Sequence, residues 1–368
     1  MKRYYEFDPK GEVIFSLDSK YEVSETSDLE IQAPPIKDEN IVEASAAEAA
    51  HADDGEVAIA DEASAPEDVP TPTHDSTTLN TIRMRASLKH LTLASHYFSR
   101  ILSSPANANT IKTKGYIEIE LSSDENASAL VILLNIIHGY PRGVPQWIDF
   151  ETFTDVAILV DNFECREVIE LYSDIWIKGL ARPIDTCLPD VTGWLYVCWV
   201  FRKLDKFNIM RRFLQYQSTG PIDTFGLLIP DWIVDNIEKH RQEAIRQLVS
   251  ALYDLVEELQ GKKIGHSFAC TSLMLGALLK AMKPLGLGFP RPEAPFTGFC
   301  INELVKGLRN MKNPVVPGIC HDKKDVKCCL LMENVALFLN NLKSYVTRSS
   351  LESFSSEQGG LSLWLVPK

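Results

Sequence analysis

Strand-like and helix-like patterns alternate in the first part of the chain. Residues 7–17 join a turn-forming Asp-Pro-Lys-Gly to an apolar run, which is typical of a turn followed by a short strand. A second strand-like piece, beginning at Ile82, leads into a helix that ends in Ser95-x-x-Phe98. Ile117–Leu121 again alternates with a period of two, so its two glutamates share one face, which we expect to be solvated.

Helical spacing dominates the rest of the sequence. Residues 124–139 predict an almost wholly apolar helix, and Ser122-Ser-Asp-Glu125 before it has the form of a capping box. Two consecutive helices are expected within 149–180. Further helices are predicted at 190–204, 206–217, 231–260, 267–282, 299–310 and 325–347.

The apolar helix at 124–139 is the first candidate for a functional surface. A helix that is apolar on most sides lies at the centre of a fold or at an interface. The sequence alone leaves both readings open. We take Leu130, Ile132, Leu133 and Ile136 as the candidate partner interface.

Charge is concentrated in one segment. The chain carries a net charge of −13, and residues 19–80 hold 16 acidic residues against Lys20 and Lys37. This segment is poor in large apolar residues, so we predict a disordered acidic insert, either a solvated spacer or an acidic binding segment. Deleting residues 22–78 is expected to leave thermal stability nearly unchanged. The remainder is close to neutral, so no nucleic-acid binding is expected.

The eight cysteines and the N-terminal residues indicate the cellular compartment of the protein. Several cysteines, such as Cys198, sit inside apolar helical runs, where core packing explains them. The first residues do not resemble a signal peptide, and no run approaches the roughly 18 apolar residues of a membrane helix. We therefore expect an intracellular protein, in the cytoplasm or nucleus, with reduced thiols and no membrane partner.

Nothing in the sequence has the spacing of a catalytic, cofactor or metal site. Cys300, Cys320, His321, Cys328 and Cys329 form the densest group of possible ligands, but the C-x2–4-C pair typical of zinc sites is missing. We therefore expect no metal, no cofactor and no enzymatic activity.

Histidines and basic residues have structural explanations. His90, His96 and His138 are expected to be packed or capping residues rather than catalytic bases. The basic cluster from Arg202 to Arg212 is interleaved with aromatic residues. Single-stranded nucleic acid is bound by such pairs, but an amphipathic helix with its basic residues outward gives the same pattern and is favoured.

Several stretches resemble fungal BTB/POZ-domain proteins. They are Asp8-Pro-Lys-Gly-Glu-Val13, Met84-Arg-Ala-Ser-Leu-Lys-His-Leu-Thr-Leu-Ala-Ser95 and Leu133-Leu-Asn-Ile-Ile-His-Gly139. The resemblance implies a mainly helical α+β protein. A BTB/POZ-like domain, a small sheet flanked by helices, would combine residues 5–18 with 81–180. A helical C-terminal domain (181–350) and a tail (351–368) would follow.

The resemblance implies association with other proteins, as a scaffold that forms a homodimer or captures a partner. Alternatives are a substrate adaptor of a cullin-type ubiquitin ligase and a nuclear regulator that recruits corepressors. Cullin-binding members often show a hydrophobic-x-Glu pattern, but the corresponding Leu130-Val131-Ile132 has no carboxylate, which favours the scaffold. Ser87 stands where the family commonly has a histidine.

Overall fold

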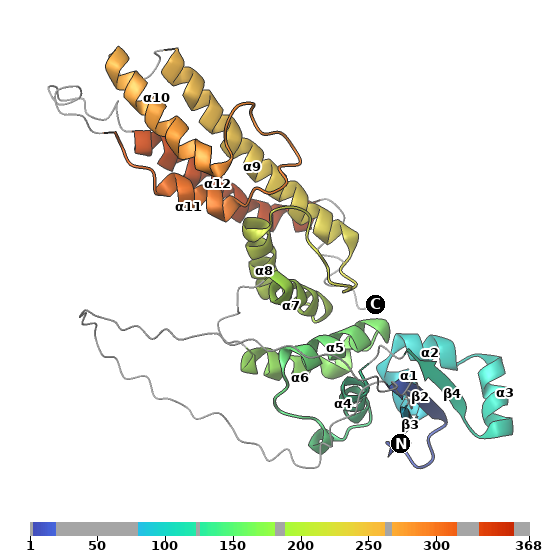
Figure 1. Ribbon diagram of the computed structural model, residues 1–368. Coiled ribbons are helices and arrows are strands. Elements are labelled where there is room, and N and C mark those ends of the chain that lie inside the picture. Colours follow the sequence, from blue (N-terminus) through green and yellow to red (C-terminus); the bar gives the residue numbers. More distant parts are fainter. Residues whose placement is uncertain are drawn as a thin grey trace, which may run out of the picture.

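The computed structural model describes residues 3–19, 80–122, 126–180, 188–261, 267–314 and 331–356. Within these ranges the protein is mostly helical and carries one small mixed sheet (Figure 1). The α+β class is therefore confirmed. The predicted acidic insert, apart from its end residues Ser19 and Asn80, lies outside the described residues, so its prediction stays open.

Four strands form the sheet in the order β1-β3-β2-β4. β2 and β3 are antiparallel, with Phe15 opposite Met84, whereas β1 pairs with β3 and β4 with β2 in parallel. The three predicted strands are confirmed, and the first strand was not foreseen. Their bounds are β1 Arg3–Glu6, β2 Val13–Ser19, β3 Asn80–Ala86 and β4 Ile117–Leu121.

The single helix predicted to end at Phe98 is wrong, because the chain breaks at Ser95. The extended backbone of Ser95 ends one helix, and its Oγ accepts a hydrogen bond from the Phe98 N–H at 2.9 Å to cap the next. A further helix, largely polar, was not predicted and is capped by Ser104. These helices are α1 Leu88–Ala94, α2 His96–Leu102 and α3 Pro105–Lys114.

The apolar helix and the two helices after it are confirmed. α4 is capped by the Asn126 side chain rather than by the predicted box at Ser122, since Asn126 Oδ1 accepts from the N–H groups of the first turn. Residues 123–125 of that box lie outside the described residues. The bounds are α4 Ala127–Ile137, η2 Pro141–Gly143, α5 Phe150–Asn162 and α6 Arg166–Gly179.

The second half is helical, as predicted. In Figure 1, α7 and α8 lie between the sheet-containing body and a bundle of α9 to α12. The predicted range 231–260 matches α9 in full, and α12 runs further than predicted. The bounds are α7 Leu188–Val200, α8 Leu204–Gln217, α9 Asp231–Gln260, α10 Phe268–Met282, η3 Lys283–Leu285, α11 Ile301–Arg309 and α12 Leu331–Ser356.

Two hydrophobic cores meet inside α9. The first extends from the sheet through α4 to α8 and ends at Ile237, and the second begins at Ala244. Between them lies the fully buried Arg241, which pairs with both carboxylate oxygens of Glu238 at 2.7 Å. It also donates to the carbonyls of Pro295, Phe296 and Phe299. These bonds satisfy the buried guanidinium and fasten the loop before α11 to α9.

Candidate interaction surfaces

The structure places the predicted interface residues of α4 in the first core. Leu130 and Leu133 are fully buried and Ile132 is 8% exposed, while Ile136 is half-buried. α4 packs against α1, α5, α6 and η2. Leu130, Ile132 and Leu133 therefore pack within this chain, because a partner could reach them only by displacing a neighbouring helix.

An outward apolar face is found instead on α6. Val168, Leu171 and Ile175 are three and four residues apart, so they share one side of the helix, which we call the α6 stripe. Leu171 is 70% exposed and Ile175 is 42% exposed, whereas Val168 is half-buried. Contiguous exposed apolar side chains of this kind mark sites of association.

The opposite side of α6 explains why the stripe cannot turn inward. Ile169, Trp176 and Ile177 are buried, and the indole N–H of Trp176 donates to the carbonyl of Pro145 at 2.9 Å. α6 packs through this side on α4 and α5 (Figure 1). The helix thus has two apolar faces. In the sequence, positions 168, 171 and 175 and positions 169, 176 and 177 lie on different sides of the helix, and this spacing is the signal that separates the two faces.

Trp147 extends the stripe at the C-terminal end of α6. Its ring lies directly against the backbone of Gly179, where a β-carbon would clash with the indole, and about half of the side chain is exposed. Charged residues border the stripe, including Glu167, Glu170 and Lys178. An apolar centre with a charged border is the usual composition of a protein–protein interface.

The α4 helix ends at a buried histidine. His138 Nδ1 contacts the Leu134 carbonyl at 2.8 Å, and Nε2 accepts a hydrogen bond from the Ser87 N–H at 2.9 Å. This geometry requires the neutral ring with its proton on Nδ1. Burial lowers the pKa of His138, as does the nearby His90, so both effects favour that neutral form.

His138 is therefore confirmed as a packed, capping residue. It ties the end of α4 to the junction of β3 and α1, and it lies next to Ser87, where the BTB/POZ family commonly has a histidine. His90 and His96 are exposed rather than packed, although the His90 ring lies 5.1 Å from that of His138, so the packed part of their prediction is not met.

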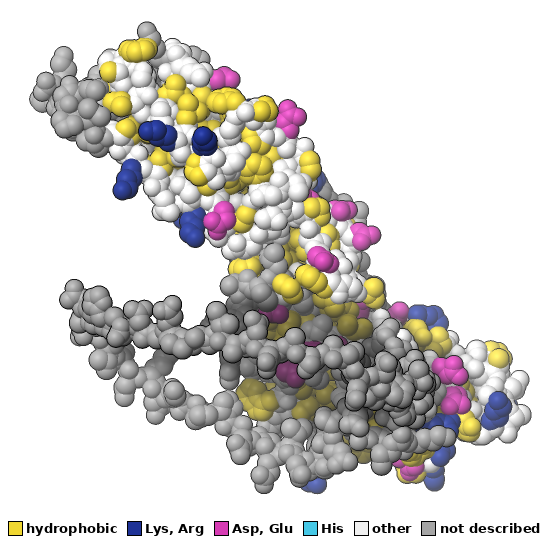
Figure 2. Space-filling view, viewed as in Figure 1, with side chains coloured by type: hydrophobic (Ala, Val, Ile, Leu, Met, Phe, Trp, Pro, Cys, Tyr) yellow, Lys and Arg dark blue, Asp and Glu magenta, His cyan; other side chains and the backbone are white. Residues whose placement is uncertain are grey.

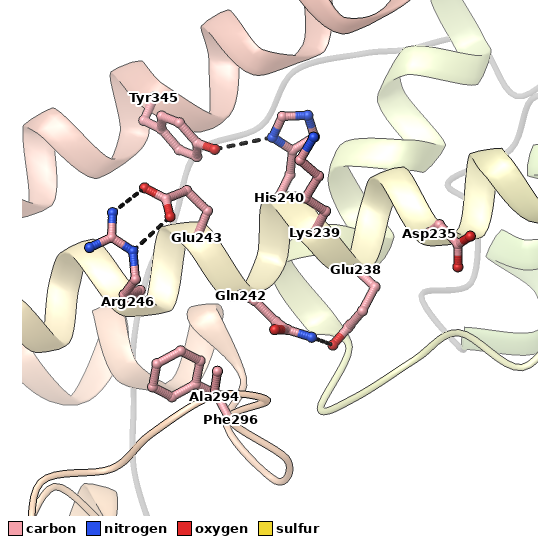
Figure 3. Close-up of a pocket in the computed structure, with 10 residues that line it drawn as sticks. All are labelled: Asp235, Glu238, Lys239, His240, Gln242, Glu243, Arg246, Ala294, Phe296 and Tyr345. Atoms are coloured by element: carbon pink, nitrogen blue, oxygen red, sulfur yellow. Dashed lines mark hydrogen bonds and ion pairs between the residues drawn. The ribbon is translucent and has the colours of Figure 1, made fainter. Parts of the chain in front are cut away.

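A polar groove of about 540 Å³ runs along α9 (Figure 3). On one side His240 Nδ1 lies 3.1 Å from the Tyr345 hydroxyl of α12, and on the other side lie Ala294 and Phe296. Glu243 makes a two-point pair with Arg246 at 2.6 and 2.7 Å. The groove brings together both signs of charge and one aromatic hydroxyl.

The chemistry of the groove does not point to catalysis. The Arg246 hydrogen bonds lower the pKa of Glu243, so its carboxylate is a weak base, and burial raises the pKa of Tyr345, which keeps its hydroxyl protonated. The lining residues include no serine, threonine or cysteine that could act as a nucleophile.

The basic residues from Arg202 to Arg212 do not all face outward, although Lys206 is exposed. Arg211 is fully buried, where it donates to Asn236 Oδ1 at 3.3 Å and burial lowers its pKa to about 10. The Arg202 guanidinium stacks over the Trp199 ring, and Lys203 pairs with Asp174 of α6 at 2.6 Å. The predicted outward placement of every basic residue is therefore wrong, because packing between α8 and α9 encloses Arg211.

The cysteines that the structure describes are buried. They are Cys165, Cys198, Cys270 and Cys300. Burial raises the pKa of Cys165 and of Cys198 to about 12, so these thiols are protonated packing groups, as expected. Cys320, His321, Cys328 and Cys329 lie outside the described residues. Within the described ranges no group of three or more His, Cys, Asp or Glu side chains is arranged to hold a metal ion.

α10 is apolar beyond its packed side. By length and composition alone the stretch Phe268–Leu285, which covers α10 and η3, could cross a membrane, with a mean hydropathy of 1.2 and 28% of it buried; the core helix of a soluble protein passes the same test. Its buried residues, among them Met274 and Leu278, pack in the second core. Figure 2 shows hydrophobic side chains over the α10 region, with Lys or Arg side chains among them.

No protein-family model, curated protein or solved structure matches this chain. The BTB/POZ resemblance therefore rests on the residues quoted for it, and function has to be argued from the surfaces described above.

Proposed function

We propose that this chain is a non-enzymatic protein–protein interaction module whose N-terminal domain is of the BTB/POZ type. The observation that carries the proposal is the α6 stripe, in which Leu171 and Ile175 remain exposed on a helix anchored by Trp176. Binding of a partner that covers Leu171 and Ile175 is favourable, because it removes both apolar side chains from water.

The stripe is the centre of a binding surface rather than the whole of it. A stable interface covers about 800 Å² on each partner, more than three side chains can supply. Trp147 adds an aromatic residue at one end, and half-exposed tryptophans are frequent anchors of binding energy. The occupant is a second copy of the chain, packed by two-fold symmetry, or another protein with an apolar ridge.

Affinity capture of the tagged full chain from its own cells, with a second copy carrying a different tag, tests the proposal. The Leu171→Asp/Ile175→Asp variant places two charges on the stripe and should reduce recovery of the second copy or of other proteins at least about tenfold. Leu93→Asp is the matched control, since Leu93 is 77% exposed on α1. Both variants should keep the wild-type melting temperature.

If the double variant recovers the same proteins at the same level as wild type, the α6 proposal is wrong. Recovery of a cullin would select the adaptor alternative over the scaffold, despite the missing carboxylate at Leu130-Val131-Ile132. A charged substitution at Ile132 is unsuitable for this test, because Ile132 is a core residue. A loss of binding in that variant would reflect unfolding.

A further inference from the structure

A second exposed apolar surface lies far along the chain from α6, where the loop after α8 enters α9. Phe225 and Leu228 are 53% and 63% exposed, and Trp232, the second residue of α9, is also exposed. We call these three residues the α9 N-terminal surface. Trp232 meets Trp199 of α7 edge to face, with ring centroids 5.6 Å apart, which ties the surface to the first core.

The backbone holds these side chains outward. Ile229 and Ile233 are buried and anchor the loop, so the neighbouring Leu228 and Trp232 point the other way. The Phe225 N–H donates to Asp223 Oδ1 at 2.8 Å, and the Leu227 N–H donates to the Thr224 carbonyl at 2.9 Å. Phe225 itself has a φ of 51°, a conformation that is uncommon for a bulky residue. Local bonds therefore fix the exposure of the surface.

We propose that the chain's own C-terminal segment, Leu361-Ser-Leu-Trp-Leu-Val366, docks on the α9 N-terminal surface. Five of these six residues are apolar, and they follow Gly359-Gly360. Removing the apolar side chains of this segment from water is favourable, and it requires a surface on which they can pack. The exposed side chains of the α9 N-terminal surface are of matching chemistry, large and uncharged.

The course of α12 brings the segment to the right place. α12 runs antiparallel to α9 (Figure 1), and the contact of Tyr345 with His240 fixes their relative level. Ser356 follows Tyr345 by 11 residues, about 16 Å of helix, and Trp232 precedes His240 by eight residues, about 12 Å. The helix therefore ends close to the level of Trp232.

The connection from Ser356 is long enough for docking within one chain. Residues 357–360 span up to about 13 Å when extended. A segment tethered by so short a link experiences an effective concentration on the order of millimolar, so even weak contacts favour the docked state. A second copy of the chain has no such tether, so the high effective concentration favours the chain's own segment as the occupant.

Hydrogen exchange of the full chain, followed by mass spectrometry, tests the proposal in both directions. In the wild type, amides of residues 361–366 should exchange at least about tenfold more slowly than in a free peptide of the same sequence. Leu228→Ser should remove that protection. Conversely, Leu363→Ser/Leu365→Ser should speed exchange in residues 222–229, while leaving α10 unchanged.

The control is Leu337→Ser, which removes an exposed leucine of α12 and should leave the segment protected. Phe225→Ser serves as a second variant if Leu228→Ser lowers the melting temperature. Free-peptide exchange of residues 361–366 in the wild type would overturn the proposal, as would unchanged protection in both surface variants. Protection that disappears on dilution would show that the segment docks on a second copy, and would overturn docking within one chain.

Discussion

α4 and α6 belong to the same part of the molecule, and both are rich in apolar residues. They differ in how much of their apolar surface is buried. α4 is buried on nearly all sides, because α1, α5 and α6 pack around it. α6 buries one apolar side and leaves a second one facing water. The comparison shows that a helix with apolar residues on most sides can be either a core helix or an interface helix. Which of the two it becomes depends on how many other elements pack against it in the fold.

The largest expected difference between the two helices is in stability. Leu133→Ala in α4 should lower the free energy of unfolding by roughly 2–5 kcal/mol, since it opens a cavity at a fully buried site. Leu171→Ala in α6 should change it by less than about 0.5 kcal/mol, because its side chain is mostly in water. Urea denaturation of both variants measures the contrast. Equal losses would mean that one of the two helices has been misplaced.

A smaller effect concerns the end of α4. Burial holds the folded-state pKa of His138 below its ordinary value of 6.5, so the unfolded chain binds the extra proton more readily. The stability that His138 contributes is therefore fully present above about pH 6.5 and is lost as the pH falls toward the lowered value. Protonation also removes the Nε2 acceptor of the Ser87 N–H.

His138→Leu isolates this contribution. The variant should lose about 1–3 kcal/mol at pH 7.5, because the buried Ser87 N–H is left without its acceptor. The gap between wild type and variant should narrow as the pH is lowered from 7.5 to 5.5. Denaturation curves across that range measure it. A gap that widens toward pH 5.5 would show that the folded state prefers the charged ring.

The sequence predicts the long amphipathic elements well and the packing around them poorly. The periodicity of α9 defines its bounds because one apolar side is repeated over many turns. β1 is a short edge strand, and α3 is largely polar, so neither has a periodic pattern to detect. The break at Ser95 depends on a capping bond of one hydroxyl within a continuous helical pattern.

The candidate surface shows the same limit. Leu130, Ile132 and Leu133 were predicted as an interface because their helix lacks a polar side, but burial of that side depends on three neighbouring helices that the sequence does not place. Arg211 was expected on the outward face of an amphipathic helix, and it is instead buried where α8 packs on α9, beside Asn236. Both expectations depend on tertiary contacts rather than on local structure.

Hydroxyl-radical footprinting of the captured complex and of the isolated chain tests the central contrast most directly. The account predicts that Leu171 and Ile175 are oxidised in the isolated chain and protected in the complex, while Leu130, Ile132 and Leu133 remain unmodified in both. Protection of the α4 residues on binding, together with unchanged oxidation at Leu171 and Ile175, would contradict it.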